Sequence, residues 1–255
     1  MQTPRTNGRK ERSEIDPVRR DLMLRFASLG DNCELAVAQR TFGAEPMDLL
    51  RWAWTPIDVV LRLLAADFDR IEQKLTVMRK GARYDVFSER YNFVWHTWIR
   101  QVDHDLEAVL EIEQRRLPGM AAKLRKEMRE ASRIFVIKQT RESLDPRRVR
   151  QIHTFMQRYG KPVLMYVTLG EAISVQEERP RLLRGTLPRF AEPSLVPSTT
   201  AADEWLALCQ MAARLVDERY GAAAGDGATC ADGVPADRTT SVLAIQAGNA
   251  TLPPG

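Results

Sequence analysis

Residues 134–169 read IFVIKQTRESLDPRRVRQIHTFMQRYGKPVLMYVTL, and this stretch decides the fold. Residues 134–137 form an apolar run of strand length, and residues 163–169 form a second one. Between them, residues 145–160 open with an Asp-Pro pair and close with a glycine, which is typical of a helix. Two strands joined by a helix form a right-handed crossover and a parallel pair. We therefore expect an α/β fold with one small mixed or parallel sheet flanked by helices.

Upstream of this unit, the apolar residues 22–29 predict a buried strand. The turn Gly30-Asp31-Asn32 follows it, and residues 33–42 predict a short helix that ends before a glycine. A second helix is predicted from Pro56, with Thr55 as its N-cap and an apolar stripe that continues to Leu75.

Residues 91–99 alternate as a strand does, so His96 shares one face with Val94 and Trp98. Two helices are predicted over 105–117 and 120–131, separated by the Pro-Gly pair between them. A last helix is predicted over 201–220, with its thiol Cys209 packed beside an apolar stripe.

Composition divides the chain into three parts. Residues 1–17 form a polar basic leader that we expect to be disordered, and the Gly- and Ala-rich residues 221–255 form a tail that we also expect to be disordered. Residues 18–220 form one α/β domain. Residues 184–200, which contain three prolines, are the only stretch of this domain with the composition of a linker.

The overall composition narrows the classes of function. The net charge is only +4, and the basic leader lacks the interleaved aromatic residues of nucleic-acid sites, so nucleic-acid binding ranks last. No apolar run is long enough to span a membrane or to act as a secretion signal, so we expect a cytoplasmic protein without membrane contact. Three cysteines without CxxC spacing indicate neither a disulfide framework nor a zinc site. We assign no metal and no cofactor.

Cys33 follows a tight turn and begins a predicted helix. Free N–H groups and the helix dipole at such a position favour the thiolate, which is the nucleophilic form of cysteine. A catalytic thiol also needs a histidine as base, and the chain has only three, His96, His104 and His153. A packed, unreactive Cys33 and a hydrogen-bonded core His96 are the alternatives that the spacing leaves open.

Three segments carry a resemblance to a known family. Residues 28–36 read SLGDNCELA, residues 39–52 continue as QRTFGAEPMDLLRW, and residues 91–96 read YNFVWH. Together with FVIK at residues 135–138, they are similar to a bacterial domain family of unknown function that is described as papain-like cysteine peptidases and has a Ser-Leu-Gly-x-Asn-Cys signature.

The resemblance implies that Cys33 is the nucleophile and His96 its base, and it marks no third catalytic residue. Asn32 is a possible donor to an oxyanion or a helix cap, and Asp48 is a matched position of unknown role.

The expected function is accordingly a papain-like cysteine peptidase or a related thiol hydrolase or acyl-transfer enzyme. The alternative is a non-catalytic binding or accessory domain, linked to glycan or surface-polymer biosynthesis, in which Asp31, Asn32, Asp48 and Trp52 line a polar cleft. The substrate and the oligomeric state stay unknown from the sequence.

Overall fold

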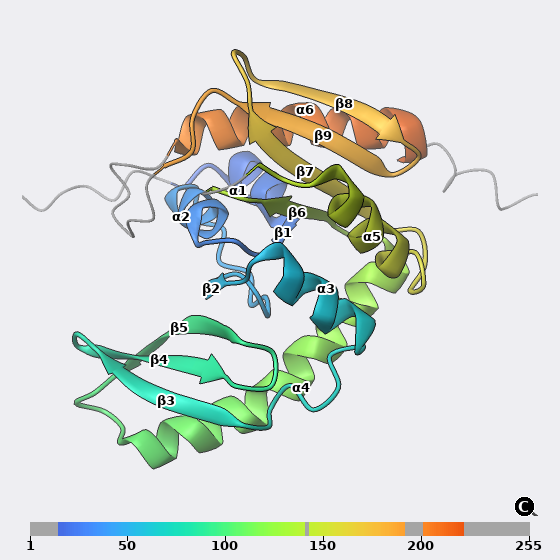
Figure 1. Cartoon of the computed structure of the whole chain (residues 1–255). Coiled ribbons are helices and arrows are strands. Elements are labelled where there is room, and N and C mark those ends of the chain that lie inside the picture. The colour runs from blue at the N-terminus through green and yellow to red at the C-terminus, as the bar shows by residue number, and fades with distance from the viewer. Residues whose placement is uncertain (1–14, 141–142, 192–200, 222–255) are drawn as a thin grey trace, which may run out of the picture.

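The computed structural model describes residues 15–140, 143–191 and 201–221, which form one α/β body (Figure 1). The predicted α/β class is confirmed. In chain order the elements are α1 (Pro17–Leu24), β1 (Phe26–Ser28), α2 (Glu34–Thr41), β2 (Ala53–Trp54), α3 (Ile57–Ala65), β3 (Leu75–Lys80), β4 (Arg83–Ser88), β5 (Phe93–Arg100), α4 (Leu106–Glu130), β6 (Ile134–Lys138), α5 (Pro146–Met156), β7 (Val163–Leu169), β8 (Ser174–Arg179), β9 (Leu182–Leu187) and α6 (Ala202–Tyr220).

A five-stranded sheet with the order β1-β6-β7-β9-β8 lies at the centre. The predicted parallel pair is confirmed, because β6 and β7 run parallel with Ile134 opposite Val163. β1 and β9 extend the parallel sheet on its two sides, and β8 closes it as an antiparallel edge strand. All four parallel strands therefore end at the same edge.

Two apolar clusters cover the two faces of this sheet. Alternate residues of β6 point to opposite faces, so Phe135 and Ile137 join α3, α4 and α5, whereas Ile134 and Val136 join α1, α2 and α6. In Figure 1 these two sets of helices lie on either side of the sheet. The helix after β1 therefore packs on one face and the helix after β6 on the other.

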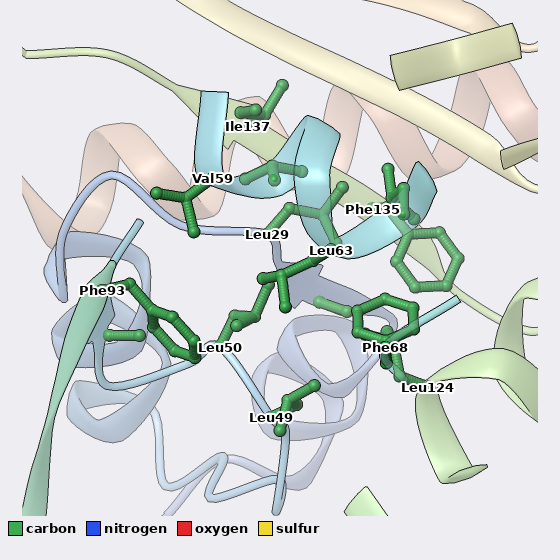
Figure 2. Packing of buried hydrophobic residues seen from close by; sticks show 14 of the residues in the cluster. Leu29, Leu49, Leu50, Val59, Leu63, Phe68, Phe93, Leu124, Phe135 and Ile137 are labelled. Carbon is green, nitrogen blue, oxygen red and sulfur yellow. The ribbon is translucent and has the colours of Figure 1, made fainter. Parts of the chain in front are cut away.

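A second, antiparallel sheet with the order β2-β5-β4-β3 was not predicted as a sheet. Only its strand β5 was predicted, and its faces are confirmed: Phe93, Trp95 and Thr97 are buried, whereas His96 is half-buried on the other face. Figure 2 shows Phe93 of this sheet beside Leu50, which precedes β2, in the larger cluster that also contains Leu63 of α3 and Leu124 of α4. The shared cluster fixes the small sheet against the large one.

The predicted strand over 22–29 is wrong in its first half. Residues up to Leu24 belong to α1, because the Asp16 side chain accepts from the Val18 and Arg19 N–H groups and Pro17 takes the first helical position. The strand itself is confined to β1. The rest of the predicted leader, residues 1–14, and the tail from residue 222 lie outside the described residues.

The helix predicted from Pro56 is real but shorter, and Thr55 is not its cap. The N-cap is Pro56 without a side-chain hydrogen bond, and the Thr55 hydroxyl donates to the Leu29 carbonyl instead. α3 ends at Ala65 because the chain turns through left-handed backbone at Asp67 and Phe68.

The two helices predicted over 105–131 are one helix, α4, with Pro118 inside it. Proline removes one backbone hydrogen bond, at a cost of about 3 kcal/mol. Six buried residues distributed on both sides of it hold the helix together, and each buried apolar side chain contributes about 1.5–3 kcal/mol. They are Val109, Glu113, Leu117, Ala121, Leu124 and Met128.

The remaining predicted helices and strands are present, but some of them begin or end at other residues than predicted. α5 ends at Met156 rather than at Gly160, and α6 matches the last predicted helix. The first part of the predicted linker is strand β9, which pairs with β7, and residues 192–200 lie outside the described residues. Among the helices that the structure describes, none is long and apolar enough to cross a membrane.

Candidate functional site

A tight turn after β1 holds Cys33 in place. Gly30 has a φ of 127°, and a Cβ atom there would lie 1.5 Å from the Thr55 hydroxyl, so only glycine fits. The Asp31 N–H donates to the Thr55 carbonyl at 3.1 Å. The turn is thereby fastened to the segment that leads from β2 to α3.

Cys33 lies at the start of α2, as predicted, and occupies the N-cap position there without a side-chain cap bond. The side chain is buried, with 8% exposure. Burial raises the pKa of the Cys33 thiol to about 12, and the Asp85 carboxylate raises it further, while Lys138, Arg51 and Arg40 lower it. The expectation that the helix start favours the thiolate is therefore wrong for the resting protein, because desolvation outweighs the nearby positive charges.

His96 lies opposite Asp85 in the pairing of β5 with β4. Its Nδ1 is 2.8 Å from Asp85 Oδ1, and the carboxylate is mostly shielded from water while the imidazole is about one third exposed. A carboxylate at Nδ1 fixes the ring orientation and leaves Nε2 as the nitrogen that exchanges protons.

Side-chain contacts bring α2 against the face of β5 that carries His96. The Arg40 guanidinium of α2 stacks on Trp98 of β5 at 4.2 Å from the ring centre and on Trp52 at 4.4 Å. Cys33 precedes Arg40 by two helical turns and so lies on the same side of α2. His96 precedes Trp98 by two strand residues and so lies on the same face of β5.

Asp85 connects the two candidates. It pairs with His96 and also acts electrostatically on the Cys33 thiol. Within the described residues no hydrogen bond joins the thiol to the imidazole, so the resting site holds them as neighbours of one carboxylate rather than as a bonded pair.

The side chain of Asn32 accepts a hydrogen bond from the first residue of α2, whose N-cap position Cys33 occupies. Its Oδ1 accepts from the Glu34 N–H at 3.0 Å, and its Nδ2 donates to the Thr140 hydroxyl at 3.1 Å. Of the two roles left open by the sequence, these contacts correspond to the cap.

Asp48 is bound by two cations, Arg133 and Lys123. Its Oδ1 accepts from Arg133 at 2.6 Å and from Lys123 at 2.8 Å, and these two cations lower the pKa of the carboxyl against the effect of burial. Its contacts fasten the segment before β2 to α4 and to the start of β6. Among the described residues Asp48 therefore shares no hydrogen-bond partner with Asp31 and Asn32, which are both bonded to Thr140.

A buried ion cluster lies beside Cys33 at the ends of β1 and β6. Lys138 Nζ is 3.0 Å from Glu34 and 3.4 Å from Asp31, and all three side chains are nearly excluded from water. The Thr140 N–H and hydroxyl both donate to Asp31, at 2.8 and 2.6 Å. The cluster braces the turn of Cys33 against the loop after β6.

The sequence analysis missed Asp85 and the role of Lys138. Aspartate is depleted in strands, so its place inside the apolar alternation of residues 84–87 is a signal that was available. A lysine that ends a strand of buried residues is a second signal, because a buried ammonium group needs carboxylate partners. The other two histidines lie apart from this site, His104 before α4 and His153 within α5.

No family model, curated protein or solved structure matches this chain.

Proposed function

We propose that this protein is a papain-like thiol hydrolase or acyl-transfer enzyme in which Cys33 is the nucleophile, His96 carries the proton and Asp85 orients His96. The observation that carries the proposal is the 2.8 Å contact of His96 Nδ1 with Asp85, on the face of β5 whose Trp98 stacks with Arg40 of the helix that Cys33 begins. A helix that bears the cysteine and faces an antiparallel sheet that bears the histidine is the arrangement of papain-like enzymes.

The first step follows from the protonated state of the thiol. Because burial raises the pKa of Cys33 to about 12, the sulfur attacks as its proton leaves, and His96 Nε2 accepts that proton. The new bond joins Sγ to the carbonyl carbon of the substrate, and the carbonyl π electrons move to its oxygen. Asp85 stabilises the imidazolium that results.

The second step expels the leaving group and completes the acyl transfer. The C–O⁻ bond re-forms the carbonyl, the bond to the leaving group breaks, and His96 returns its proton to that group. Water or another nucleophile then attacks the thioester, and His96 takes and returns a proton again. The Cys33 N–H has no hydrogen-bond partner among the described residues, so it is available as a donor to the oxyanion.

A second candidate, the non-catalytic binding domain, is favoured by the burial of Cys33 and by its raised thiol pKa. In this account Cys33 only packs, and the buried ion cluster of Asp31, Glu34 and Lys138 braces the turn behind a recognition surface, as in an accessory domain for glycans or surface polymers.

For the enzyme we propose the cytoplasm, because three cysteines without paired spacing fit a reducing compartment.

Acylation by para-nitrophenyl acetate separates the two candidates without knowledge of the substrate. At neutral pH the intact protein is expected to gain an acetyl group on Cys33, located by peptide mass mapping, and to release nitrophenol. Cys33→Ser is expected to lose this adduct. His96→Ala is expected to slow acylation by about 100-fold or more, because general-base catalysis contributes that much.

Matched controls are available for both residues. His104→Ala removes an exposed histidine, and Cys230→Ser removes a thiol from the tail, so both variants are expected to acylate Cys33 at the rate of the unchanged protein. A Cys33 that stays unmodified, or that reacts equally fast in His96→Ala, would overturn the enzymatic proposal and leave the binding domain.

A further inference from the structure

A cavity of about 470 Å³ opens at the carboxyl edge of the parallel sheet. Its volume is within the range of pockets that hold small ligands. Among the described residues its wall includes Thr140 after β6, Ser143 before α5, Thr168 of β7, Arg184 of β9 and Phe190.

Among the described residues that line the cavity, the charged one is the cation Arg184. Arg184 lies on β9, and no carboxylate of the described residues is within 4.0 Å of its guanidinium. Its Nε atom is buried and has no hydrogen-bond partner in the described part of the chain. None of the described residues that line the cavity is acidic.

The hydroxyl of Thr168, on the neighbouring strand β7, also lacks a hydrogen-bond partner among the described residues. Its Oγ1 atom is buried, and both Arg184 and Thr168 line the cavity. Buried donors that lack partners cost free energy, and an oxygen-rich anion would satisfy both groups at once. Ser143 adds a further hydroxyl to the same wall, whereas the Thr140 hydroxyl already donates to Asp31.

The cavity adjoins the turn of Cys33. Thr140 lines the cavity and also holds Asp31 and Asn32, the two residues before Cys33. The helix after β1 packs on one face of the sheet and the helix after β6 on the other. α/β proteins bind ligands beside the carboxyl ends of two neighbouring strands whose following helices go to opposite faces.

We propose that this cavity binds an anionic group, a carboxylate or a phosphate, and that Arg184 and Thr168 hold its oxygens. The proposal deepens the function above and rests on it in one respect: the anion belongs to the acyl substrate of Cys33. The substrate class is then a small acyl compound with a second, negatively charged end.

Titration of the full chain tests the anion site by itself. Inorganic phosphate and acetate are added in separate experiments with calorimetric detection, so that the two kinds of oxyanion are distinguished. Arg184→Gln is expected to weaken binding of the preferred anion at least tenfold, and Thr168→Val by a smaller factor. Arg79→Gln, which changes an exposed arginine on β3, is expected to bind as the unchanged protein does.

Two results would overturn the anion site: neither anion binds, or both Arg184→Gln and Thr168→Val bind as tightly as the control. Thr168→Val keeps the test valid if Arg184→Gln fails to fold. The same titrations with Cys33→Ser show whether anion binding requires the Cys33 thiol. Arg184-dependent binding together with an unreactive Cys33 supports the anion site and removes the hydrolase.

A separate measurement tests whether the cavity binds part of the substrate of Cys33. A bound anion is expected to change the rate at which para-nitrophenyl acetate acylates Cys33 in the unchanged protein, and to have no effect in Arg184→Gln. An acylation rate that is unchanged at saturating anion would overturn the assignment of the cavity to the substrate of Cys33.

Discussion

His96 Nδ1 lies 2.8 Å from Asp85 Oδ1, and the two residues are direct partners in the pairing of β5 with β4. Because both belong to one hairpin, the strand register itself fixes the imidazole against the carboxylate. The orientation of His96 therefore depends on the hairpin and not on the loop that carries Cys33.

Replacement of Asp85 by asparagine is expected to slow acylation of Cys33 by about tenfold or more while the protein stays folded. The amide cannot stabilise the imidazolium, and it favours the wrong tautomer of the ring. The acylation rate and the urea midpoint of unfolding are measured together. An Asp85→Asn variant that acylates at the original rate would remove Asp85 from the mechanism.

The sequence predicted Cys33 and His96 but not their common neighbour. A cysteine after a glycine turn and a histidine in an alternating strand are local patterns, which one segment contains in full. The role of Asp85 depends on which residue of β4 lies opposite His96, and the register of a hairpin shifts with the length of its turn. The raised pKa of Cys33 also depends on burial, which no local pattern specifies.

Stability is expected to fall above about pH 8.5 partly because of Cys33. In the unfolded chain an ordinary thiol ionises near pH 8.5, whereas burial keeps the Cys33 thiol protonated to about pH 12 in the folded protein. Between these values the unfolded chain has lost a proton that the folded chain keeps. The free energy of unfolding therefore decreases as pH rises, by up to about 1.4 kcal/mol per pH unit.

Urea unfolding of Cys33→Ala and of the unchanged protein between about pH 8 and pH 10 checks this dependence. The difference in stability is expected to shift in favour of Cys33→Ala as pH rises. Cys209 is fully buried and also has a raised thiol pKa, but its effect cancels because both proteins contain it. A constant difference across this range would mean that the Cys33 thiol ionises at its ordinary pH.

Replacement of Lys138 by methionine is expected to destabilise the protein by about 3–5 kcal/mol. The ammonium group lies between the buried carboxylates of Asp31 and Glu34, so its loss leaves two negative charges without their cation. Lys80→Met changes an exposed lysine at the end of β3 and is the control. Equal urea midpoints for the two variants would show that the ion cluster contributes little to the fold.

Gly119→Ala is expected to stabilise the protein by about 0.5–1 kcal/mol. Gly119 lies inside α4 next to Pro118, and nothing is within 4 Å of the position that a Cβ atom would take. Alanine has a higher helix propensity and meets no clash there. Thermal unfolding measures the change, and a lower melting temperature would show that residues 118–119 are not helical in solution.

The parallel unit and α6 were predictable, because their apolar residues recur with the period of the element that they form. The continuity of α4 was not, since Pro118 and Gly119 are local signals for a break that distant packing overrides. Strands β3 and β8 escaped prediction because they are largely exposed and carry charged residues on both faces.

Dibromoacetone, a reagent that alkylates a thiol and then a neighbouring imidazole, tests most directly whether Cys33 and His96 form one site. We predict that peptide mapping of the treated protein finds a covalent bridge between Cys33 and His96, that His104→Ala keeps it and that Asp85→Asn diminishes it. A reagent that stays attached to Cys33 alone, or that bridges Cys33 to another residue, would contradict the account.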